Sequence, residues 1–223
     1  MRNFLRTCPV SSTVGVITLG LKKKVFYTVS FWFIFLAGYF FIQHNTTLSD
    51  MTLLSEIDEA IPLMPEFIWI YHSLPIFVFT VMVMMIKQAS VFWRTLYSCV
   101  IATILIFAFY IALPIEYPRP EINTAGWSSA FLSLTHEVDM AMNTCPSSHV
   151  AFAWLMYLAA AHTQWARKEP WLSGTSLLWA IGISLSTLTL KQHFIIDVFA
   201  GIAVAMVSFY LAKFVPKRTP IPN

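Results

Sequence analysis

Six long apolar segments constrain the fold of this chain more than any other feature. A helix needs roughly 20 apolar residues to cross the ~30 Å hydrocarbon layer of a bilayer. Of the 223 residues, 57% are hydrophobic and only 11% are charged, which lies outside the range of soluble domains. We therefore expect an all-α membrane protein with six transmembrane helices, of which the fourth is the shortest, at Val25–Gln43, Ile70–Ile86, Leu96–Ile115, His149–Thr163, Leu172–Leu190 and Phe194–Val215.

The lysine and arginine residues predict the orientation, because short cytoplasmic loops and tails carry an excess of both. Placing the N-terminus inside puts twelve of the fourteen on the cytoplasmic side. Both termini are then cytoplasmic, with tails at residues 1–24 and 216–223 around a single membrane-embedded domain. The two cations left outside are Arg119 and Lys191, and both belong to polar motifs. We therefore expect the active site at the outer, periplasmic or lumenal, face.

Charge and cysteine usage exclude several other classes of protein. The net charge of +3 comes from the cytoplasmic tails and predicts attraction to anionic lipid headgroups, and no basic-aromatic motif predicts nucleic-acid binding. Lys22-Lys23-Lys24, directly before the first span, is typical of an uncleaved signal anchor. On this topology Cys8 lies on the cytoplasmic side, Cys99 within the membrane and Cys145 on the outer side, so no disulfide is expected. The sequence leaves the oligomeric state open.

Three short polar motifs stand in the otherwise apolar sequence. Together they contain the residue types that a phosphoryl-transfer site needs: a histidine nucleophile, a carboxylate partner, a second histidine and an arginine for the anion. The motifs are Tyr117-Pro118-Arg119-Pro120, Cys145-Pro146-Ser147-Ser148-His149 and Lys191-Gln192-His193-Phe194-Ile195-Ile196-Asp197.

His193 and Asp197 are four residues apart at the start of the last span, so a helix places them on one face, one turn apart. A carboxylate there can fix the imidazole tautomer and leave the other ring nitrogen free to attack phosphorus. The alternative is an ion pair that joins helix ends. Ionisable residues within a span are costly, which favours function.

The other two motifs also have structural alternatives. His149 heads the fourth span, where free backbone N–H groups and the hydroxyls of Ser147 and Ser148 can receive a phosphate, although either serine could be an ordinary helix cap. Arg119 lies between two prolines on a stiff, extended backbone, which suits a phosphate, although a lone boundary arginine often contacts lipid headgroups. Lys191 is a further candidate for the substrate's charge.

No metal or other cofactor is expected. His136-Glu137-Val138-Asp139 is the nearest approach to a metal motif, but position 140 is Met140, so the zinc-protease spacing is absent. The surrounding outer loop from Glu116 to Asn143 has a roughly helical spacing of apolar residues. We expect it to be either a lid over the site or an interfacial helix.

The order Arg-Pro, Pro-Ser-x-His and His-x-x-x-Asp, on six spans and one membrane face, resembles the type-2 phosphatidic acid phosphatase superfamily. The resemblance covers Leu113 to Gly201. It implies that His193 is the nucleophile, Asp197 its partner and His149 the general acid. It also implies phosphate binding by Arg119, Ser147 and Ser148.

Two positions depart from the family pattern. The superfamily usually has a lysine seven residues before the motif arginine and an arginine six residues before the nucleophilic histidine, and these positions are Ala112 and Thr187 here. Lys191 is the candidate replacement. The segment around Lys191-Gln192-His193 and the first outer loop, from Asp58 to Tyr71, are similar to the branch that contains inositol-phosphoryl transferases.

Three functions stay open at this point. The first is a metal-independent lipid phosphatase that hydrolyses a lipid phosphate or diphosphate through a phosphohistidine. The second is a headgroup phosphotransferase with an alcohol acceptor, and the third is a non-catalytic protein that binds or moves lipids, which the loss of cations at Ala112 and Thr187 favours. A transporter would carry its ionisable groups near mid-bilayer instead.

One glycosylation sequon bears on the location of the protein. Asn45-Thr46-Thr47 is a glycosylation sequon on the expected outer side, which matters only in a eukaryotic secretory membrane. In the absence of other eukaryotic signals, we expect a bacterial inner membrane with a periplasmic active site. The alternative is a eukaryotic secretory-pathway membrane with a lumenal one.

Overall fold

The computed structural model describes residues 18–46, 51–122 and 125–216. Within these ranges it contains helices and two isolated β-bridges but no β-strand, so the all-α prediction is confirmed. Several residues of the sequence argument lie outside the described ranges, namely Arg2, Arg6, Cys8, Thr47, Lys217, Arg218 and most of both tails. The helices are α1 (Leu21–Asn45), α2 (Glu56–Ala60), η1 (Pro65–Phe67), α3 (Ile68–Tyr71), α4 (Leu74–Phe79), η2 (Thr80–Met85), α5 (Ala89–Ala112), α6 (Trp127–Val138), α7 (Ser148–Ala161), α8 (Gln164–Lys168), α9 (Pro170–Thr189) and α10 (Ile195–Leu211).

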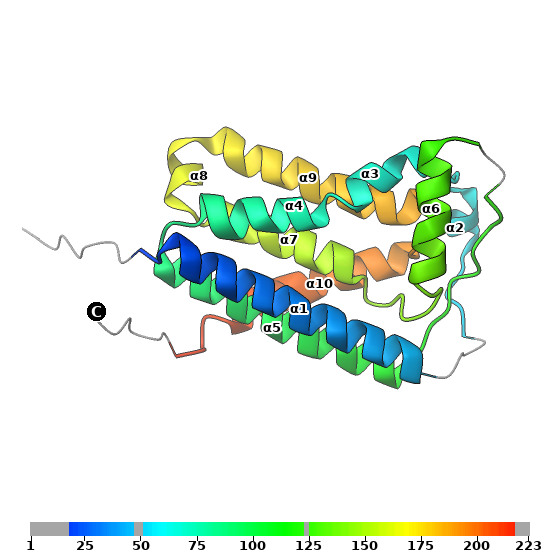
Figure 1. Ribbon diagram of the computed structural model, residues 1–223, viewed down its shortest axis with the longest axis horizontal. Helices are drawn as coiled ribbons and strands as arrows, with labels where there is room; N and C mark the ends of the chain where they lie inside the picture. Colours follow the sequence, from blue (N-terminus) through cyan, green and yellow to red (C-terminus); the bar gives the residue numbers. More distant parts are fainter. Residues whose placement is uncertain (1–17, 47–50, 123–124, 217–223) are drawn as a thin grey trace, which may run out of the picture.

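The long helices form a bundle whose neighbours along the chain run in opposite directions (Figure 1). α1, α5, α7, α9, α10 and the segment from η1 to η2 lie along the long axis of the molecule. α6 lies across one end of this bundle, near α2, whereas α8 and both ends of the described chain lie at the other. The helical spacing predicted for the outer loop is therefore confirmed as α6.

Four of the six expected spans are long and apolar enough to cross a membrane: α1, the segment Pro65–Met85, α5 and α9. α7 and α10 are apolar but have only 14 and 17 residues, or about 21 and 26 Å at the rise of an α-helix. α7 packs against α4, α5, α9 and α10. A helix enclosed in this way is shielded from lipid by its neighbours over much of its length. Six spans therefore remain a prediction, of which four are supported.

The second expected span is not one regular helix. It begins at Pro65, five residues before the predicted start, and passes from 3-10 through α-helical to π-helical geometry at Thr80–Met85. Pro75 lies in the first turn of α4, where proline is tolerated because that N–H has no partner within the helix. The break in the span therefore falls just before this proline.

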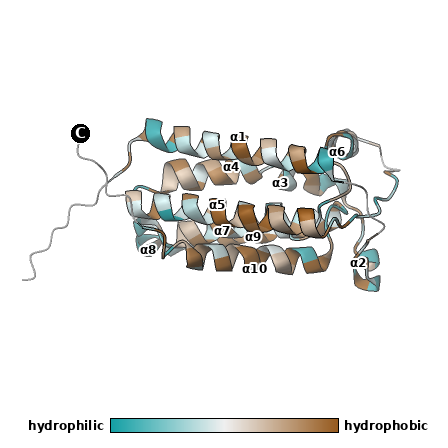
Figure 2. Cartoon of the chain, turned by 90° about the horizontal axis from the view of Figure 1, so that it is seen from below, coloured by the Kyte–Doolittle hydropathy of each residue, from teal (hydrophilic) through white to brown (hydrophobic). Residues whose placement is uncertain are grey.

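The charged residues are segregated between the two ends of the bundle. Figure 2 shows hydrophobic residues along the middle of α5 and α10 and hydrophilic residues toward the helix ends and on α2. Of the ten lysines and arginines that the structure describes, only Arg119 and Lys191 belong to the α6 end. The other eight belong to the α8 end: Lys22, Lys23, Lys24, Lys87, Arg94, Arg167, Lys168 and Lys213. This arrangement matches the asymmetry that the orientation argument requires.

Candidate active site

A narrow polar cleft lies at the α6 end of the bundle. Four of the seven predicted site residues line it, namely Arg119, Ser148, His149 and His193. Asp197, Ser147 and Lys191 lie outside the lining, although Asp197 contacts His193 directly. The structure therefore brings all three sequence motifs to one place.

The cleft forms where the N-termini of α7 and α10 meet. The backbone N–H of Ser147 donates to the carbonyl of Asp197 over 3.2 Å. Gly201, one turn further along α10, lies so close to α7 that a Cβ there would approach the Ser147 carbonyl oxygen to 2.7 Å. Ser147 caps α7, because its Oγ accepts the N–H of Val150. Of the two serines, Ser147 is therefore the helix cap, and Ser148 is the one that lines the cleft.

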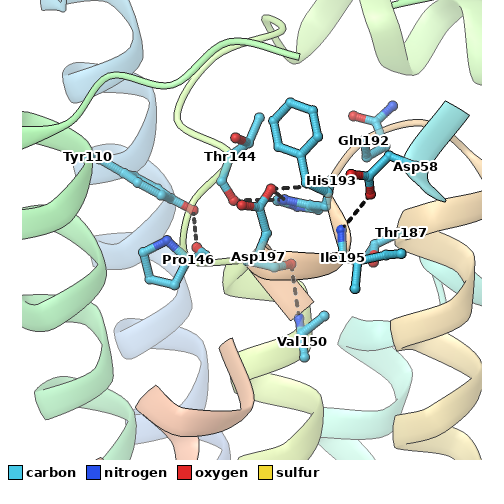
Figure 3. Close-up of polar contacts among 12 residues, drawn as sticks. Asp58, Tyr110, Thr144, Pro146, Val150, Thr187, Gln192, His193, Ile195 and Asp197 are labelled. Atoms are coloured by element: carbon cyan, nitrogen blue, oxygen red, sulfur yellow. Dashed lines mark hydrogen bonds and ion pairs between the residues drawn. The ribbon is translucent and has the colours of Figure 1, made fainter. Parts of the chain in front are cut away.

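His193 is held by two oxygen atoms (Figure 3). Its Nδ1 lies 2.8 Å from the carbonyl oxygen of Thr144 and 3.4 Å from Oδ2 of Asp197. A carbonyl can only accept a hydrogen bond, so this network assigns the proton to Nδ1 and the free lone pair to Nε2. The nitrogen that could attack phosphorus is therefore defined by the partners of the other ring nitrogen.

Asp197 is fully buried and has a second function in the fold. Its Oδ2 also accepts the backbone N–H of Phe194 at 2.9 Å, which caps the start of α10. The sequence predicted Asp197 as the partner that orients His193, and the structure adds the closer carbonyl of Thr144. A backbone carbonyl in a loop leaves no sequence signal, so this contact could not have been predicted.

His149 lies in the first turn of α7 and lines the cleft together with His193. Its ring stacks on Tyr71, with 4.0 Å between ring centroids and 21° between the planes. His149 also lines a second, larger cavity of about 370 Å³ that has mainly aromatic and aliphatic walls from α1, α4, α6 and α7. His149 therefore stands where a polar cleft meets an apolar cavity.

Arg119 is held by the C-terminal end of α6 and by Gln192. Its Nη1 donates to the carbonyls of His136 (3.0 Å) and Asp139, and its Nη2 donates to Oε1 of Gln192 (2.9 Å). Burial lowers the pKa of the guanidinium, although the nearby Asp139 carboxylate opposes this. Within the described chain, Nε is a buried atom of Arg119 without a partner. Arg119 therefore fixes the wall of the cleft and keeps one N–H for a ligand.

Lys191 points away from the cleft. Its Nζ donates to the backbone carbonyl of Asp58 at 2.6 Å, and burial lowers its pKa. The Asp58 carboxylate in turn accepts the backbone N–H of Ile195 at 2.8 Å. Lys191 thus joins the loop before α10 to α2. At the two positions where the family resemblance expects cations, Ala112 is exposed at the end of α5 and Thr187 is buried, with its carbonyl accepting the N–H groups of Gln192 and His193.

Asp139, which the sequence analysis considered only within a rejected metal motif, is a functional candidate. Its Oδ1 accepts the Tyr39 hydroxyl at 2.6 Å and Nε2 of Gln43 at 3.2 Å, and it lines both the cleft and the apolar cavity. Burial raises the pKa of its carboxyl. Its two hydrogen bonds and the charge of the nearby Arg119 oppose this effect of burial.

Two further residues of the cleft were missed, Asn143 and Gln192. Both are almost completely buried, at 2% and 4% exposure. Asn143 has a positive φ of 61°, a backbone conformation in which asparagine is enriched. Both residues lie within or next to the recognised motifs, but single amide residues carry no spacing signal. No group of three or more histidine, cysteine or acidic residues that could hold a metal occurs in the part of the chain that is described.

Comparison with known proteins adds one finding. A family model described as the PAP2 superfamily matches residues 42–211, which is most of the chain and includes all three motifs. No curated protein matches the chain.

Proposed function

Because the chain belongs to the PAP2 superfamily, we propose that it is an integral membrane lipid phosphatase that cleaves a lipid phosphate or diphosphate through a phosphohistidine. Membership supports an activity of the phosphatase or phosphotransferase type. The observation that carries the proposal is the hydrogen bond from Nδ1 of His193 to the Thr144 carbonyl, since it leaves the Nε2 lone pair free. His149 lines the same cleft and supplies the second proton-transfer group.

In the first step, Nε2 of His193 attacks phosphorus while the bond from phosphorus to the lipid oxygen breaks. His149 donates its proton to that departing oxygen, which leaves as the alcohol when the substrate is a lipid phosphate and as the lipid monophosphate when it is a diphosphate. The positive charge that develops on the His193 ring is stabilised by the Thr144 carbonyl and by Asp197, whose Oδ2 is 3.4 Å from Nδ1. The product of this step is a phosphohistidine.

In the second step, water attacks the phosphohistidine. His149, now neutral, takes the proton of the water as the N–P bond breaks, and inorganic phosphate leaves. His193 returns to its starting tautomer because its Nδ1 proton remains shared with the Thr144 carbonyl. The scheme requires no metal, so activity should survive EDTA.

The apolar cavity supports a lipid as the substrate. It shares five lining residues with the polar cleft, namely Tyr39, Tyr71, Asp139, Ser148 and His149, so the two adjoin each other. His193 lines only the cleft. We propose that the departing oxygen lies beside His149, which lines both spaces, so that the apolar part of the lipid alcohol extends into the aromatic cavity.

The same cavity favours a second candidate, a phosphotransferase. An alcohol with an apolar chain could enter the cavity after the first product has left, and His149 would then deprotonate this acceptor in place of water. The outcome depends on whether α6 excludes water from the cleft. This candidate differs from the phosphatase only in the acceptor of the second step.

The arrangement in the membrane is part of the proposal. Six crossings would place both termini in the cytoplasm and the cleft at the outer face, and the eight cations at the opposite end support this orientation. We propose a bacterial inner membrane with a periplasmic site, with a lumenal site in a eukaryotic secretory membrane as the alternative.

The test is phosphate release by detergent-purified protein from a panel of lipid phosphates and diphosphates, with and without alcohol acceptors, and with EDTA. We expect release by the wild type and none by His193→Ala. Phosphorylated alcohol in place of free phosphate would instead identify the transferase. If wild type and His193→Ala are equally inactive, the catalytic proposal is wrong and a lipid-binding function takes its place.

A further inference from the structure

The polar cleft contains an unusual number of buried polar atoms without partners. Within the described residues, eleven buried side-chain nitrogen or oxygen atoms lack a hydrogen-bond partner, and five of them belong to residues that line the cleft. These five are Arg119 Nε, Asn143 Nδ2, Asn143 Oδ1, Thr144 Oγ1 and Gln192 Nε2. An unpaired buried polar atom costs roughly 1–3 kcal/mol. Such a concentration is explained if the atoms bind a polar ligand.

Four of these five atoms can donate a hydrogen bond. The Arg119, Asn143 and Gln192 nitrogens carry N–H groups, and Thr144 carries a hydroxyl. The orientation of the Gln192 side-chain amide is set by its oxygen, because Oε1 accepts a hydrogen bond from Nη2 of Arg119 at 2.9 Å. The Nε2 end of the amide is therefore the unpaired one. Asn143 is held in a left-handed backbone conformation, which is costly and is often found at ligand sites. The set of donors suits an oxyanion.

The charge on the cleft is low for a phosphate site. Arg119 is its one lysine or arginine among the described residues, and the Asp139 carboxylate lines the same cleft with the opposite charge. The Lys191 ammonium is bound to Asp58, and positions 112 and 187 are alanine and threonine. Neutral amides can satisfy the oxygens of a phosphate, but they cannot balance a second negative charge.

We infer that Asn143 and Gln192 are catalytic residues whose side-chain amides, together with Thr144 Oγ1 and Arg119 Nε, bind the phosphate oxygens and select the phosphate in its singly charged form. The inference rests on the proposed function for the identity of the ligand. The amides replace the cations that are missing at Ala112 and Thr187. Gln192, Thr144 and His193 all line the cleft, and Figure 3 shows Thr144 and Gln192 on either side of His193. A singly charged phosphate is either a diester or a protonated monoester.

The first test removes the donors one at a time. Gln192→Glu keeps an oxygen for Arg119 and removes the N–H groups, and Asn143→Gly removes the amide at a backbone conformation that glycine adopts without strain. We expect each variant to lose about 10²-fold in kcat, the effect of removing one oxyanion donor. Gln164→Glu is the matched control, because this exposed glutamine lies in α8 at the opposite end. Wild-type kcat in Gln192→Glu and Asn143→Gly would overturn the inference.

The second test measures charge selection by binding alone. His193→Ala, which cannot turn over substrate, is titrated at pH 8 with phosphatidic acid and with its methyl diester. The monoester is then doubly charged, because its second pKa is about 6. We expect the singly charged diester to bind about tenfold more tightly, and the added substitution Gln192→Lys to reverse this order. Tighter binding of the doubly charged lipid would contradict the inference.

The two tests separate this inference from the proposed function. Diester-selective binding without phosphate release from any lipid would refute the phosphatase and leave the charge selection standing. Phosphate release that depends on His193, combined with tighter binding of the doubly charged lipid, would refute only the inference. If Gln192→Glu or Asn143→Gly fails to fold, the comparison of the two lipids with unaltered amides still decides.

Discussion

Replacing Gly201 with alanine should separate the two helix ends that form the active site. The new Cβ would lie 2.7 Å from the Ser147 carbonyl oxygen, 3.1 Å from Cβ of Val150 and 3.3 Å from the backbone nitrogen of Ala151. Two of these three atoms are backbone atoms of the first turn of α7, so no side chain can rotate away. α7 must move by several tenths of an ångström relative to α10. Overpacking of this kind costs about 1–3 kcal/mol of folding free energy.

The displacement should reduce activity more than the loss of stability explains. His149 lies two residues after Ser147, and Asp197 lies one turn before Gly201, so the shift alters the position of His149 relative to His193. A misplacement of 1 Å can cost about 10²-fold in rate, and we expect kcat to fall by about tenfold for the smaller shift here. The assay is phosphate release well below the melting temperature, alongside thermal unfolding in detergent.

Gly174→Ala provides the control for this experiment. Gly174 is also in a long helix, α9, but nothing lies within 4 Å of its Cβ position. We expect this variant to keep its activity and to gain roughly 0.4–1 kcal/mol, because alanine lowers the conformational entropy of the unfolded chain. If Gly201→Ala is as stable and as active as Gly174→Ala, the close contact of α7 and α10 is not what positions the site.

Three further predictions test the contacts of the cleft. Asp197→Asn should fold, because an amide oxygen can still accept the Phe194 N–H, but kcat should fall by about 10²-fold or more because the charge beside His193 is lost; unchanged kcat would argue against Asp197 as the partner of His193. Arg119→Lys should increase amide hydrogen exchange in α6, since lysine lacks the fork that holds the carbonyls of His136 and Asp139, and wild-type exchange would contradict that role. Burial, with the nearby Arg119, lowers the pKa of His136 to about 4. Between pH 6.5 and 4 the unfolded chain therefore binds a proton that the folded chain does not, and the stability of the fold should fall as the pH falls through this window. Melting temperatures measured across this window should fall less in His136→Gln than in the wild type, and an equal fall would contradict the prediction.

The helices could be predicted because the apolar segments and their flanking cations fix them locally. The first and fifth spans follow directly from hydrophobic length, which is a property of each segment alone. The third was placed seven residues too late, because α5 begins at Ala89 and includes the charged Arg94. The second span was placed too late in the chain, since Pro65 and Phe67 belong to a 3-10 turn that no hydrophobicity pattern distinguishes from a loop. The short length of α7 was predicted, whereas its enclosure by α4, α5, α9 and α10 was not, because burial among helices is a tertiary property.

The candidate site was predictable only where a side chain carries a recognisable motif. His149, His193 and Arg119 were expected together because the predicted spans place their motifs on one membrane face, and they line one cleft. The position of Lys191 depends on the backbone carbonyl of Asp58, 133 residues away, which no local pattern encodes. The unpaired amides of Asn143 and Gln192 were missed for the same reason, because an orphan hydrogen-bond donor exists only in three dimensions.

The phosphohistidine itself is the most direct test of this account. Detergent-purified protein would be mixed with a lipid phosphate, quenched in alkali, in which phosphohistidine survives, and examined by peptide mass spectrometry. The His149→Ala variant is included because loss of the base should slow the second step. We expect a phosphoryl group on His193 alone, absent from His193→Ala. A phosphoryl group on any other residue, or substrate turnover with His193 never modified, would contradict the central claim.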